Sequence, residues 1–249
     1  LKMLTDLKPD YVIACYDLPQ PTFRHESYDG YKKGRKSTED SLKVQIDESR
    51  NVFHALHVPI YEAPGFEADD MLGTIVEQVT ESNPDMRIVI VSGDMDTLQL
   101  VDNDRVVVYT MKKGIQETMI YKESDVVERY LFTPSFVADY KGLRGDPSDN
   151  IIGVPGIGEK TATDLITKFG TIEEIYEKLH KDRQIFLDAG IKPRILDLLT
   201  EHEEGAQFSK ILATIRRDAP INFELPKKTF KDQYDAEKMV RLIREYEFR

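Results

Sequence analysis

Residues 153–162 read Gly-Val-Pro-Gly-Ile-Gly-Glu-Lys-Thr-Ala, a glycine-rich loop that leads directly into a helical pattern. The helix is expected over Glu159–Phe169, and Gly170 should end it because glycine tolerates the left-handed conformation common at helix ends. The next four residues, Thr171 to Glu174, have the form of a capping box that opens another helix. The stretch therefore predicts two helices joined by a tight turn, and with them a helical module in the second half of the chain.

Upstream of this module, short apolar runs alternate with helical patterns. The runs Tyr11–Tyr16, Arg87–Ser92 and Arg105–Tyr109 are rich in β-branched residues and are expected to form buried parallel strands. Ser41–His57 and Ala68–Val79 carry apolar residues near helical spacing. This alternation predicts a doubly wound, mainly parallel α/β layer.

These patterns divide the chain into an α/β domain over residues 1–130 and a helical region over residues 131–249. In the second region, Lys210–Ile215 is expected to be a short strand or a buried helix turn. Asp235–Tyr246 is expected to form a closing amphipathic helix.

The composition indicates a globular protein, with 40% apolar and 32% charged residues over 249 positions. No long apolar run and no leader is visible, so the expected address is the cytoplasm. Cys15 is the only cysteine, which excludes an internal disulfide and a thiolate zinc cage, and it is expected to be buried and inert. The net charge of −11 does not exclude a nucleic-acid partner, because basic residues gather away from the acidic motifs.

Acidic residues follow the predicted strands or lie at turns and helix starts in four places. Because ligands gather at the carboxyl ends of strands in an open α/β sheet, the acids that end the first two runs are expected to point into a site. Each group alone fits ordinary helix capping or turn chemistry. The candidate metal ligands are Asp17, Glu67, Asp69, Asp70, Asp94, Asp96, Asp146 and Asp149.

Four such groups together favour a hard divalent cation, Mg²⁺ or Mn²⁺, because many carboxylates in one place would otherwise repel one another. Two or more such ions can generate a hydroxide nucleophile and stabilise the entering and leaving oxygens at phosphorus. The expected reaction class is therefore phosphoryl hydrolysis without a Ser or His nucleophile. His54 and His57 are expected to be packing or surface residues.

The glycine-rich loop resembles the helix-hairpin-helix DNA-binding motif. Its glycines let the backbone approach a phosphate or a bridging monovalent cation, for which K⁺ is the candidate, and the following helix start adds positive potential. The alternative is a plain connection between two helices. The candidate DNA contacts are Gly153, Val154, Gly156, Ile157, Gly158, Lys160 and Thr161.

A second candidate contact is the stretch 23–36, in which five Lys and Arg residues are interleaved with three aromatic residues. It could be a solvated charged loop. Its position after the Asp17 strand favours instead a role in holding phosphates and stacking on an unpaired base. The candidates here are Arg24, His25, Tyr28, Tyr31, Lys32, Lys33, Arg35 and Lys36.

Taken together, the chain resembles the 5′-nuclease family, which includes flap endonucleases, phage 5′-exonucleases and, as the closest resemblance, the N-terminal 5′–3′ exonuclease domain of bacterial DNA polymerase I. The motifs that carry the resemblance are Tyr16-Asp17, Phe23-Arg24-His25-Glu26 with Tyr31-Lys32 and Arg35, residues 65–70, residues 92–96, residues 145–150 and the hairpin loop. The resemblance implies a PIN-like α/β fold with a helix-hairpin-helix (H3TH) module.

The resemblance also implies a function. It is that of a structure-specific 5′–3′ exonuclease or 5′-flap endonuclease that removes primers and flaps during DNA replication and repair. The expected substrates are 5′ flaps, nicked or branched duplexes and RNA-primer ends, and the expected protein is a monomer, with a polymerase fused to it in the parent.

Roles for individual residues follow from the same resemblance. Asp17, Glu67, Asp69 and Asp70 would help to form one metal site, with Asp94 and Asp96 between the sites and Asp146 and Asp149 at the second. Arg24, Lys32 and Arg35 would act as catalytic residues at the phosphate near the scissile bond.

One departure concerns the family's opening strand, which carries a further metal-binding Asp and has no counterpart in this sequence. The chain is therefore expected to be the fragment of a parent that is active, and to be weakly active or inactive by itself.

Two other functions remain open. A module of the same fold could bind branched DNA without cutting it, and a small-molecule phosphatase could use Asp94 and Asp96. The phosphatase would leave the hairpin loop without a purpose.

Overall fold

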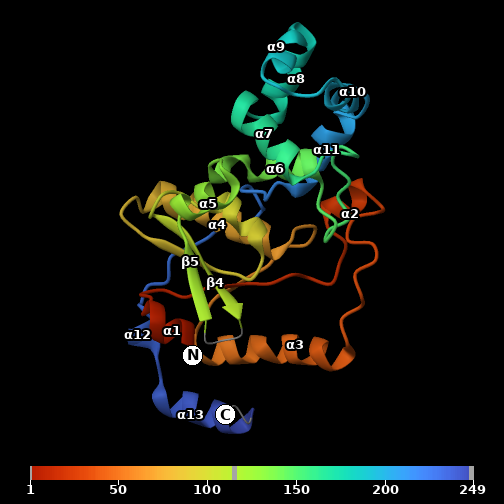
Figure 1. Ribbon diagram of the computed structural model, residues 1–249. Coiled ribbons are helices and arrows are strands. Elements are labelled where there is room, and N and C mark those ends of the chain that lie inside the picture. The colour runs from red at the N-terminus through yellow and green to blue at the C-terminus, as the bar shows by residue number, and fades with distance from the viewer. Residues whose placement is uncertain (1, 114–116, 247–249) are drawn as a thin grey trace. The chain divides into compact units, whose positions relative to one another are not determined.

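The contacts between residues divide the chain into two units, each assembled from segments that are far apart in the sequence (Figure 1). The computed structural model describes residues 2–113 and 117–246. Unit 1 comprises Leu1–Thr22, Lys36–Gln78 and Arg217–Arg249, and unit 2 comprises Phe23–Arg35 and Val79–Arg216.

Unit 1 contains a parallel pair of short strands, in which Ala14 pairs with Ile60 and Cys15 with Tyr61. Its core gathers Ala63, Met71 and Ala219 with partly buried neighbours. The elements are α1 (Lys2–Leu7), β1 (Ala14–Cys15), α3 (Asp40–Ala55), β2 (Ile60–Tyr61), the first part of α4 (Ala68–Ser82), α12 (Phe230–Gln233) and α13 (Ala236–Glu245).

The last segment of unit 1 is joined to α4 by hydrogen bonds. The Ala219 N–H donates to Thr74 Oγ1 over 2.9 Å, and the Phe223 N–H donates to Gln78 Oε1 over 2.9 Å. Farther along, Tyr246 donates its hydroxyl proton to Glu48 Oε2 of α3 over 2.7 Å. The C-terminal segment is therefore a structural part of unit 1.

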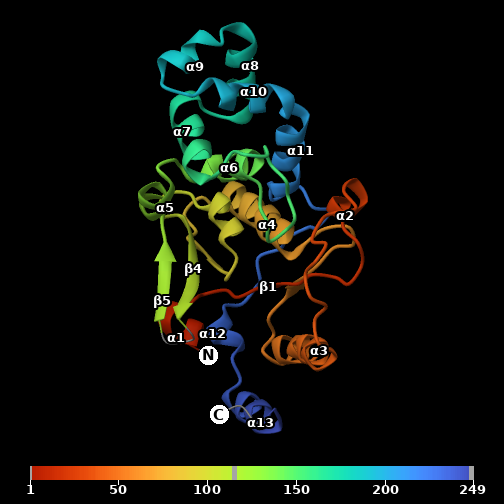
Figure 2. The ribbon, with the colours of Figure 1, turned by 45° about the vertical axis from the view of Figure 1, so that its right-hand side comes forward.

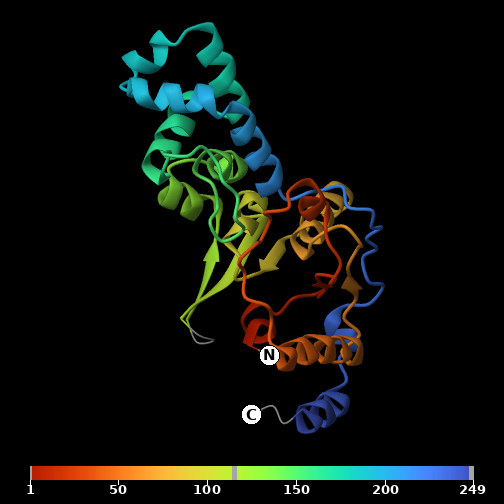
Figure 3. The ribbon, with the colours of Figure 1, turned by 90° about the vertical axis from the view of Figure 1, so that its right-hand side faces the viewer.

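Unit 2 begins with α2 and continues as a sheet with the order β3-β4-β5. Strands β3 and β4 are parallel, with Ile88 opposite Val106, whereas β4 and β5 are antiparallel and lie side by side in Figures 1 and 3. The elements are α2 (Phe23–Ser27), β3 (Ile88–Val91), the 3₁₀ helix η1 (Met95–Leu100), β4 (Val106–Lys113), β5 (Glu117–Tyr121) and α5 (Glu123–Tyr130).

Short helices follow, and Figure 2 shows several of them grouped together. They share one apolar core. Phe169 and Phe186 stack within it at 4.0 Å between ring centroids, and Leu165 and Leu196 are fully buried. The elements are η2 (Pro134–Phe136), α6 (Val137–Arg144), α7 (Glu159–Phe169), α8 (Ile172–Lys181), α9 (Gln184–Asp188), α10 (Pro193–Glu201) and α11 (Glu203–Ala213).

The predicted mixed α/β architecture is confirmed, and so are most of the elements. The bounds of α7 match the prediction, and Thr171 and Glu174 form the predicted capping box. Of the two alternatives for Lys210–Ile215, the helix turn is confirmed, because α11 ends at Ala213 with Leu212 and Ala213 buried. The strands β2 and β5 were not predicted, and β5 makes the outer pair of its sheet antiparallel.

Helix α3 forms where it was predicted, but within the structure as described its apolar side chains are not buried. Leu42 and Ile46 are 48% and 43% exposed. No helix among the described residues combines the length and apolarity needed to cross a membrane.

Candidate active site

The acidic residues of unit 1 meet at the start of α4. Asp17, which follows β1, accepts a hydrogen bond from the Ala68 N–H through Oδ1 over 2.7 Å. Asp70 accepts one from the Glu67 N–H over 3.0 Å and is fully buried. The unpaired N–H groups and the dipole at a helix start stabilise negative charge. The hydrogen bond from the Ala68 N–H to Asp17 thus joins two segments that are 51 positions apart in the sequence.

Cys15 lies beside this acidic group. Burial, and secondly the negative charge of Asp69, raises the pKa of the Cys15 thiol to about 12. The thiol therefore stays protonated at neutral pH, whereas Cys15 is only partly buried and not fully buried as predicted.

In unit 2, Asp94 and Asp96 follow β3 and open η1. Asp94 is exposed and caps the 3₁₀ helix by accepting a hydrogen bond from the Asp96 N–H over 2.9 Å. The Asp96 carboxylate forms an ion pair with the Lys141 ammonium, which reaches it from α6. The first of these contacts is local, whereas the second joins residues 45 positions apart.

The same Lys141 ammonium contacts Asp146 Oδ2 over 2.6 Å. Asp146 Oδ1 accepts two further hydrogen bonds, from the Ser148 N–H and the Ser148 hydroxyl. The three side chains that form this cluster, Asp96, Lys141 and Asp146, are each less than 20% exposed. Lys141 was not predicted as a site residue, because nothing in the sequence indicates that its ammonium lies between two acids.

The environment moves the pKa values of the two carboxyls in opposite directions. Burial, together with the charges of Asp94 and Asp146, raises the pKa of Asp96 to about 6, although Lys141 opposes the rise. Burial would also raise the pKa of Asp146, but its bonds to Lys141 and Ser148 outweigh burial and hold that pKa at about 2. The cluster is therefore a strongly coupled group of charges in a poorly solvated place.

Asp149 is held by the basic loop. Its carboxylate forms an ion pair with Arg35 and accepts a hydrogen bond from the Tyr31 hydroxyl over 3.2 Å. Backbone contacts join the same two segments: the Lys32 N–H donates to Asp149 O over 2.9 Å, and the Asn150 side-chain amide donates to Gly30 O over 2.7 Å. The predicted metal ligand and the predicted phosphate-binding loop are thus one connected structure within unit 2.

Two glycines allow the Asp146–Asn150 loop to fold. Gly145 and Gly153 have φ values of +79° and +65°. A Cβ on Gly145 would lie 2.5 Å from Ile152 O, and one on Gly153 would lie 2.2 Å from Gly145 N. The backbone therefore closes on itself at the base of the loop, where no side chain fits.

The other predicted residues of the basic stretch differ in exposure. Arg24 is buried and donates hydrogen bonds to Leu212 O and Thr214 O at the end of α11, over 2.9 and 2.7 Å. Its guanidinium is thus engaged in holding backbone carbonyls, a role that was not predicted. Lys33 and Arg35 are exposed, and the Lys32 ammonium lies 5.0 Å from the ring of Tyr31. Among the other candidates, His25 packs edge-on against Tyr31, Tyr28 packs edge-on against Phe208, and Lys36 is exposed.

In the hairpin loop, the side chains of Val154 and Ile157 are 1% and 4% exposed and belong to the helical core. Any contact from these two positions to DNA must therefore come from the backbone. Gly156 has φ +91°, and Gly158 lies at the N-cap of α7. Lys160 is exposed and Thr161 is partly exposed.

Across residues 2–113 and 117–246, no three His, Cys, Asp or Glu side chains gather in a way that could hold a metal ion by themselves. Asp17, Asp70 and Asp94 instead accept hydrogen bonds from backbone N–H groups. Lys141 and Arg35 form ion pairs with Asp96, Asp146 and Asp149. The donor chemistry still suits Mg²⁺ or Mn²⁺, because Asp96 and Asp146 are hard oxygen ligands that already share one cation.

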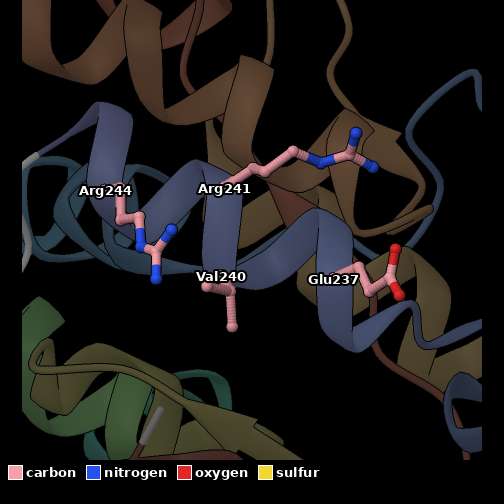
Figure 4. A pocket seen from close by; sticks show the side chains of 4 residues that line it. All are labelled: Glu237, Val240, Arg241 and Arg244. Atoms are coloured by element: carbon pink, nitrogen blue, oxygen red, sulfur yellow. The ribbon is translucent and has the colours of Figure 1, made fainter.

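A pocket lies on α13 and is lined by Glu237, Val240, Arg241 and Arg244 (Figure 4). All four side chains extend from one helix, and none is a candidate site residue. The residues that line this pocket therefore do not belong to the candidate metal-binding groups.

The chain matches two family models and has relatives among known proteins. Residues 1–131 match the family described as "5'-3' exonuclease, N-terminal resolvase-like domain", and residues 132–236 match "5'-3' exonuclease, C-terminal SAM fold". DNA polymerase I of Bacillus caldotenax is 37% identical over 99% of this chain and 27% of its own length. That of Caldicellulosiruptor bescii is 39% identical over 100% of this chain and 28% of its own length. The chain thus spans just over a quarter of these relatives.

Two solved structures share the fold. The T5 D15 protein co-crystallized with metal ions has a TM-score of 0.67 at 23% identity, covering 85% of this chain and 76% of its own. The catalytic core of Rad2 in complex with DNA substrate has a TM-score of 0.52 at 13% identity, covering 93% and 72%. These likenesses concern the fold.

Proposed function

The chain belongs to the 5′–3′ exonuclease family, whose members are nucleases that hydrolyse phosphodiester bonds, and from this premise we propose how it acts and on what. Its substrate is DNA with a 5′ end or 5′ flap at a nick or branch, including RNA-primer ends. Divalent ions, Mg²⁺ or Mn²⁺, carry the reaction.

One observation carries the proposal: Asp96 and Asp146, which lie 50 positions apart in the sequence, meet around a single cation. Bound divalent ions would supply an activated water and stabilise the oxygens at phosphorus. Asp96, Asp146 and Asp149 would hold metal in unit 2, and Asp17, Glu67, Asp69 and Asp70 would serve metal in unit 1. Asp94, exposed at the start of η1, would add a further ligand.

The chain's own cations and backbone would hold the substrate. Arg35 and Lys32 lie on the loop joined to Asp149, where their charges can engage the phosphate near the scissile bond. Arg24 supports this loop region through the end of α11. The hairpin loop would contact the duplex backbone through Gly153, Gly156 and Gly158, through Lys160 and Thr161, and through a bridging K⁺.

The wider context of this activity is also part of the proposal. The relatives are bacterial DNA polymerases I, which supports primer and flap removal in replication and repair by a cytoplasmic enzyme with a polymerase in the same protein. The structures of the T5 protein with metal ions and of Rad2 with DNA support a metal-dependent reaction on DNA.

The test is to incubate the full-length parent with a labelled 5′-flap duplex in Mg²⁺ and, separately, in a chelator. Cleavage near the branch is expected with Mg²⁺ and not with the chelator. Unlabelled flap DNA should compete with the labelled duplex and lower its cleavage. A full-length parent that binds the flap without cutting it in Mg²⁺ or Mn²⁺ would instead be a binding module of the same fold.

A further inference from the structure

The Lys141 ammonium lies between two carboxylates of unit 2. It contacts one oxygen of Asp96 and, at 2.6 Å, one oxygen of Asp146. Only 11% of the Lys141 side chain is exposed, so solvent screens these contacts poorly. Two buried carboxylates at close range repel each other strongly unless a cation neutralises them.

Lys141 joins two acids that lie on different segments of unit 2. In the described structure, Lys141 contacts both carboxylates through its ammonium, and these acids lie on η1 and on the Asp146–Asn150 loop. Both acids are hard oxygen donors, and a divalent cation carries twice the charge of an ammonium. The same pair of oxygens therefore suits either cation.

We propose that Lys141 is an internal counter-ion that competes with the divalent metal ion for Asp96 and Asp146, and that it thereby sets the metal affinity of this site. This inference rests on the proposed metal-binding role of these two acids. Before metal binds, the ammonium keeps the two carboxylates together. When metal binds, it replaces the ammonium at one or both acids, and Lys141 turns toward solvent and the phosphate of the substrate.

The first experiment measures Mn²⁺ binding without DNA, by the loss of the free-ion electron paramagnetic resonance signal, in metal-stripped wild type, Lys141→Met and Lys210→Met. Lys210 is the matched control, because its ammonium also lies between two carboxylates, Asp139 and Glu173, and its Cβ packs near Gly142 beside Lys141. We expect Lys141→Met to bind Mn²⁺ about tenfold more tightly. Lys210→Met should bind like the wild type.

A second measurement uses the unmodified protein, so that it stands even if Lys141→Met unfolds without metal. An amine-acetylating reagent is applied with and without saturating Mg²⁺, and modification of each lysine is followed by peptide mass spectrometry. Lys141 should be protected without metal and become reactive with it, whereas Lys210 should not change.

The outcomes separate this inference from the function on which it rests. If Mn²⁺ binds the wild type and Lys141→Met with equal affinity, or if Lys141 stays protected in saturating Mg²⁺, the counter-ion role is wrong and the metal role of the acids stands. If both lysine variants gain affinity equally, the effect is general charge removal, which also overturns the inference. If no variant binds Mn²⁺, the proposed metal site itself fails.

Discussion

Helix α6 contributes to two clusters that have the same composition, one lysine ammonium between two carboxylates, and that differ in what surrounds them. In the brace cluster, Lys210 contacts Asp139 and Glu173, each over 2.7 Å, and Asp139 also accepts the Ile172 N–H over 2.8 Å. These contacts join α6, α8 and α11. In the site cluster, Lys141 contacts Asp96 on η1 and Asp146 on a loop.

The difference shows that charge pairing by itself does not identify a functional site. In the brace cluster, Asp139 is only 3% exposed and is held by packed helices and the Ile172 N–H, so it cannot take another cation without moving the core. The site cluster lies where a strand end and a glycine-dependent loop present their acids together. The supporting backbone, rather than the ion pairs, separates a structural cluster from a candidate metal site.

The largest expected effect is on DNA cleavage, which a substitution in the site cluster should lower and one in the brace cluster should not. In the full-length parent, Asp146→Ala should lower single-turnover cleavage of a 5′-flap duplex on the order of a thousandfold, because a ligand of the reacting metal is lost. DNA affinity, measured by fluorescence anisotropy, should change little. Asp139→Asn, which keeps an acceptor for Ile172, should cleave at the wild-type rate. An equal loss of cleavage and binding in Asp146→Ala would contradict the metal role.

A substitution at Gly142 should disturb the brace cluster alone. A Cβ there would lie 2.5 Å from Ile172 Cδ1 and 2.9 Å from Lys210 Cβ, so Gly142→Ala should push α8 and α11 from α6. Overpacking of this kind costs about 1–3 kcal/mol, which urea unfolding can measure. The Mn²⁺ affinity of the folded variant should stay as in the wild type. A variant more stable than the wild type would show that the helices adjust freely.

Removing the Tyr31 hydroxyl tests how strongly the basic stretch 23–36 is held to the Asp146–Asn150 loop. Tyr31→Phe removes the bond to Asp149 but leaves the Arg35 ion pair, and it should lower the free energy of unfolding by about 1 kcal/mol. Tyr176→Phe is the control, since that hydroxyl donates to Leu199 O, a neutral acceptor, over the same 3.2 Å. The loss at Tyr31 should be the larger of the two because its acceptor is charged. The reverse order would show that Arg35 alone holds Asp149.

The smallest expected effect is a pH dependence at the brace cluster. Burial raises the pKa of Asp139, although Lys210 and the Ile172 N–H oppose the rise. Below the ordinary carboxyl pKa of about 4 the group is protonated in both states. As pH rises from there, the unfolded chain releases the proton first, so this group's contribution to stability falls until pH passes the raised pKa.

Asn at position 139 does not titrate. The free energy of unfolding of Asp139→Asn should therefore rise relative to the wild type as pH increases above about 4. Urea unfolding across that range measures the difference. A difference that is constant, or that falls with pH, would show that Asp139 is stabilised as the charged form.

Local chemistry made much of the fold predictable. The capping box at Thr171 and the glycine at 170 determine where α7 ends and α8 begins, and both helices form as expected. The parallel pairing of β3 with β4 followed from their β-branched composition. The acids of the candidate site were selected because each follows a strand or occupies a turn, and their role as one metal-binding set stays a prediction.

The unpredicted features depend on contacts between distant segments. Lys141 lies on a helix, and its role depends on Asp96, 45 positions earlier. Arg24 reaches carbonyls of Leu212 and Thr214 about 190 positions later, so its burial could not be read from a basic loop. The strand β5 forms by pairing with β4, and its own pattern is too short to indicate it.

The division of unit 1 into three separated segments affects the order in which the protein can fold during synthesis. The N–H groups of Ala219 and Phe223 complete the contacts of α4 with its last segment. A ribosome that has released the first hundred residues has therefore produced strands and helices of unit 1 without the piece that closes it. Unit 2, whose second segment is continuous from Val79 to Arg216, can mature first, and unit 1 becomes stable only when the final stretch emerges.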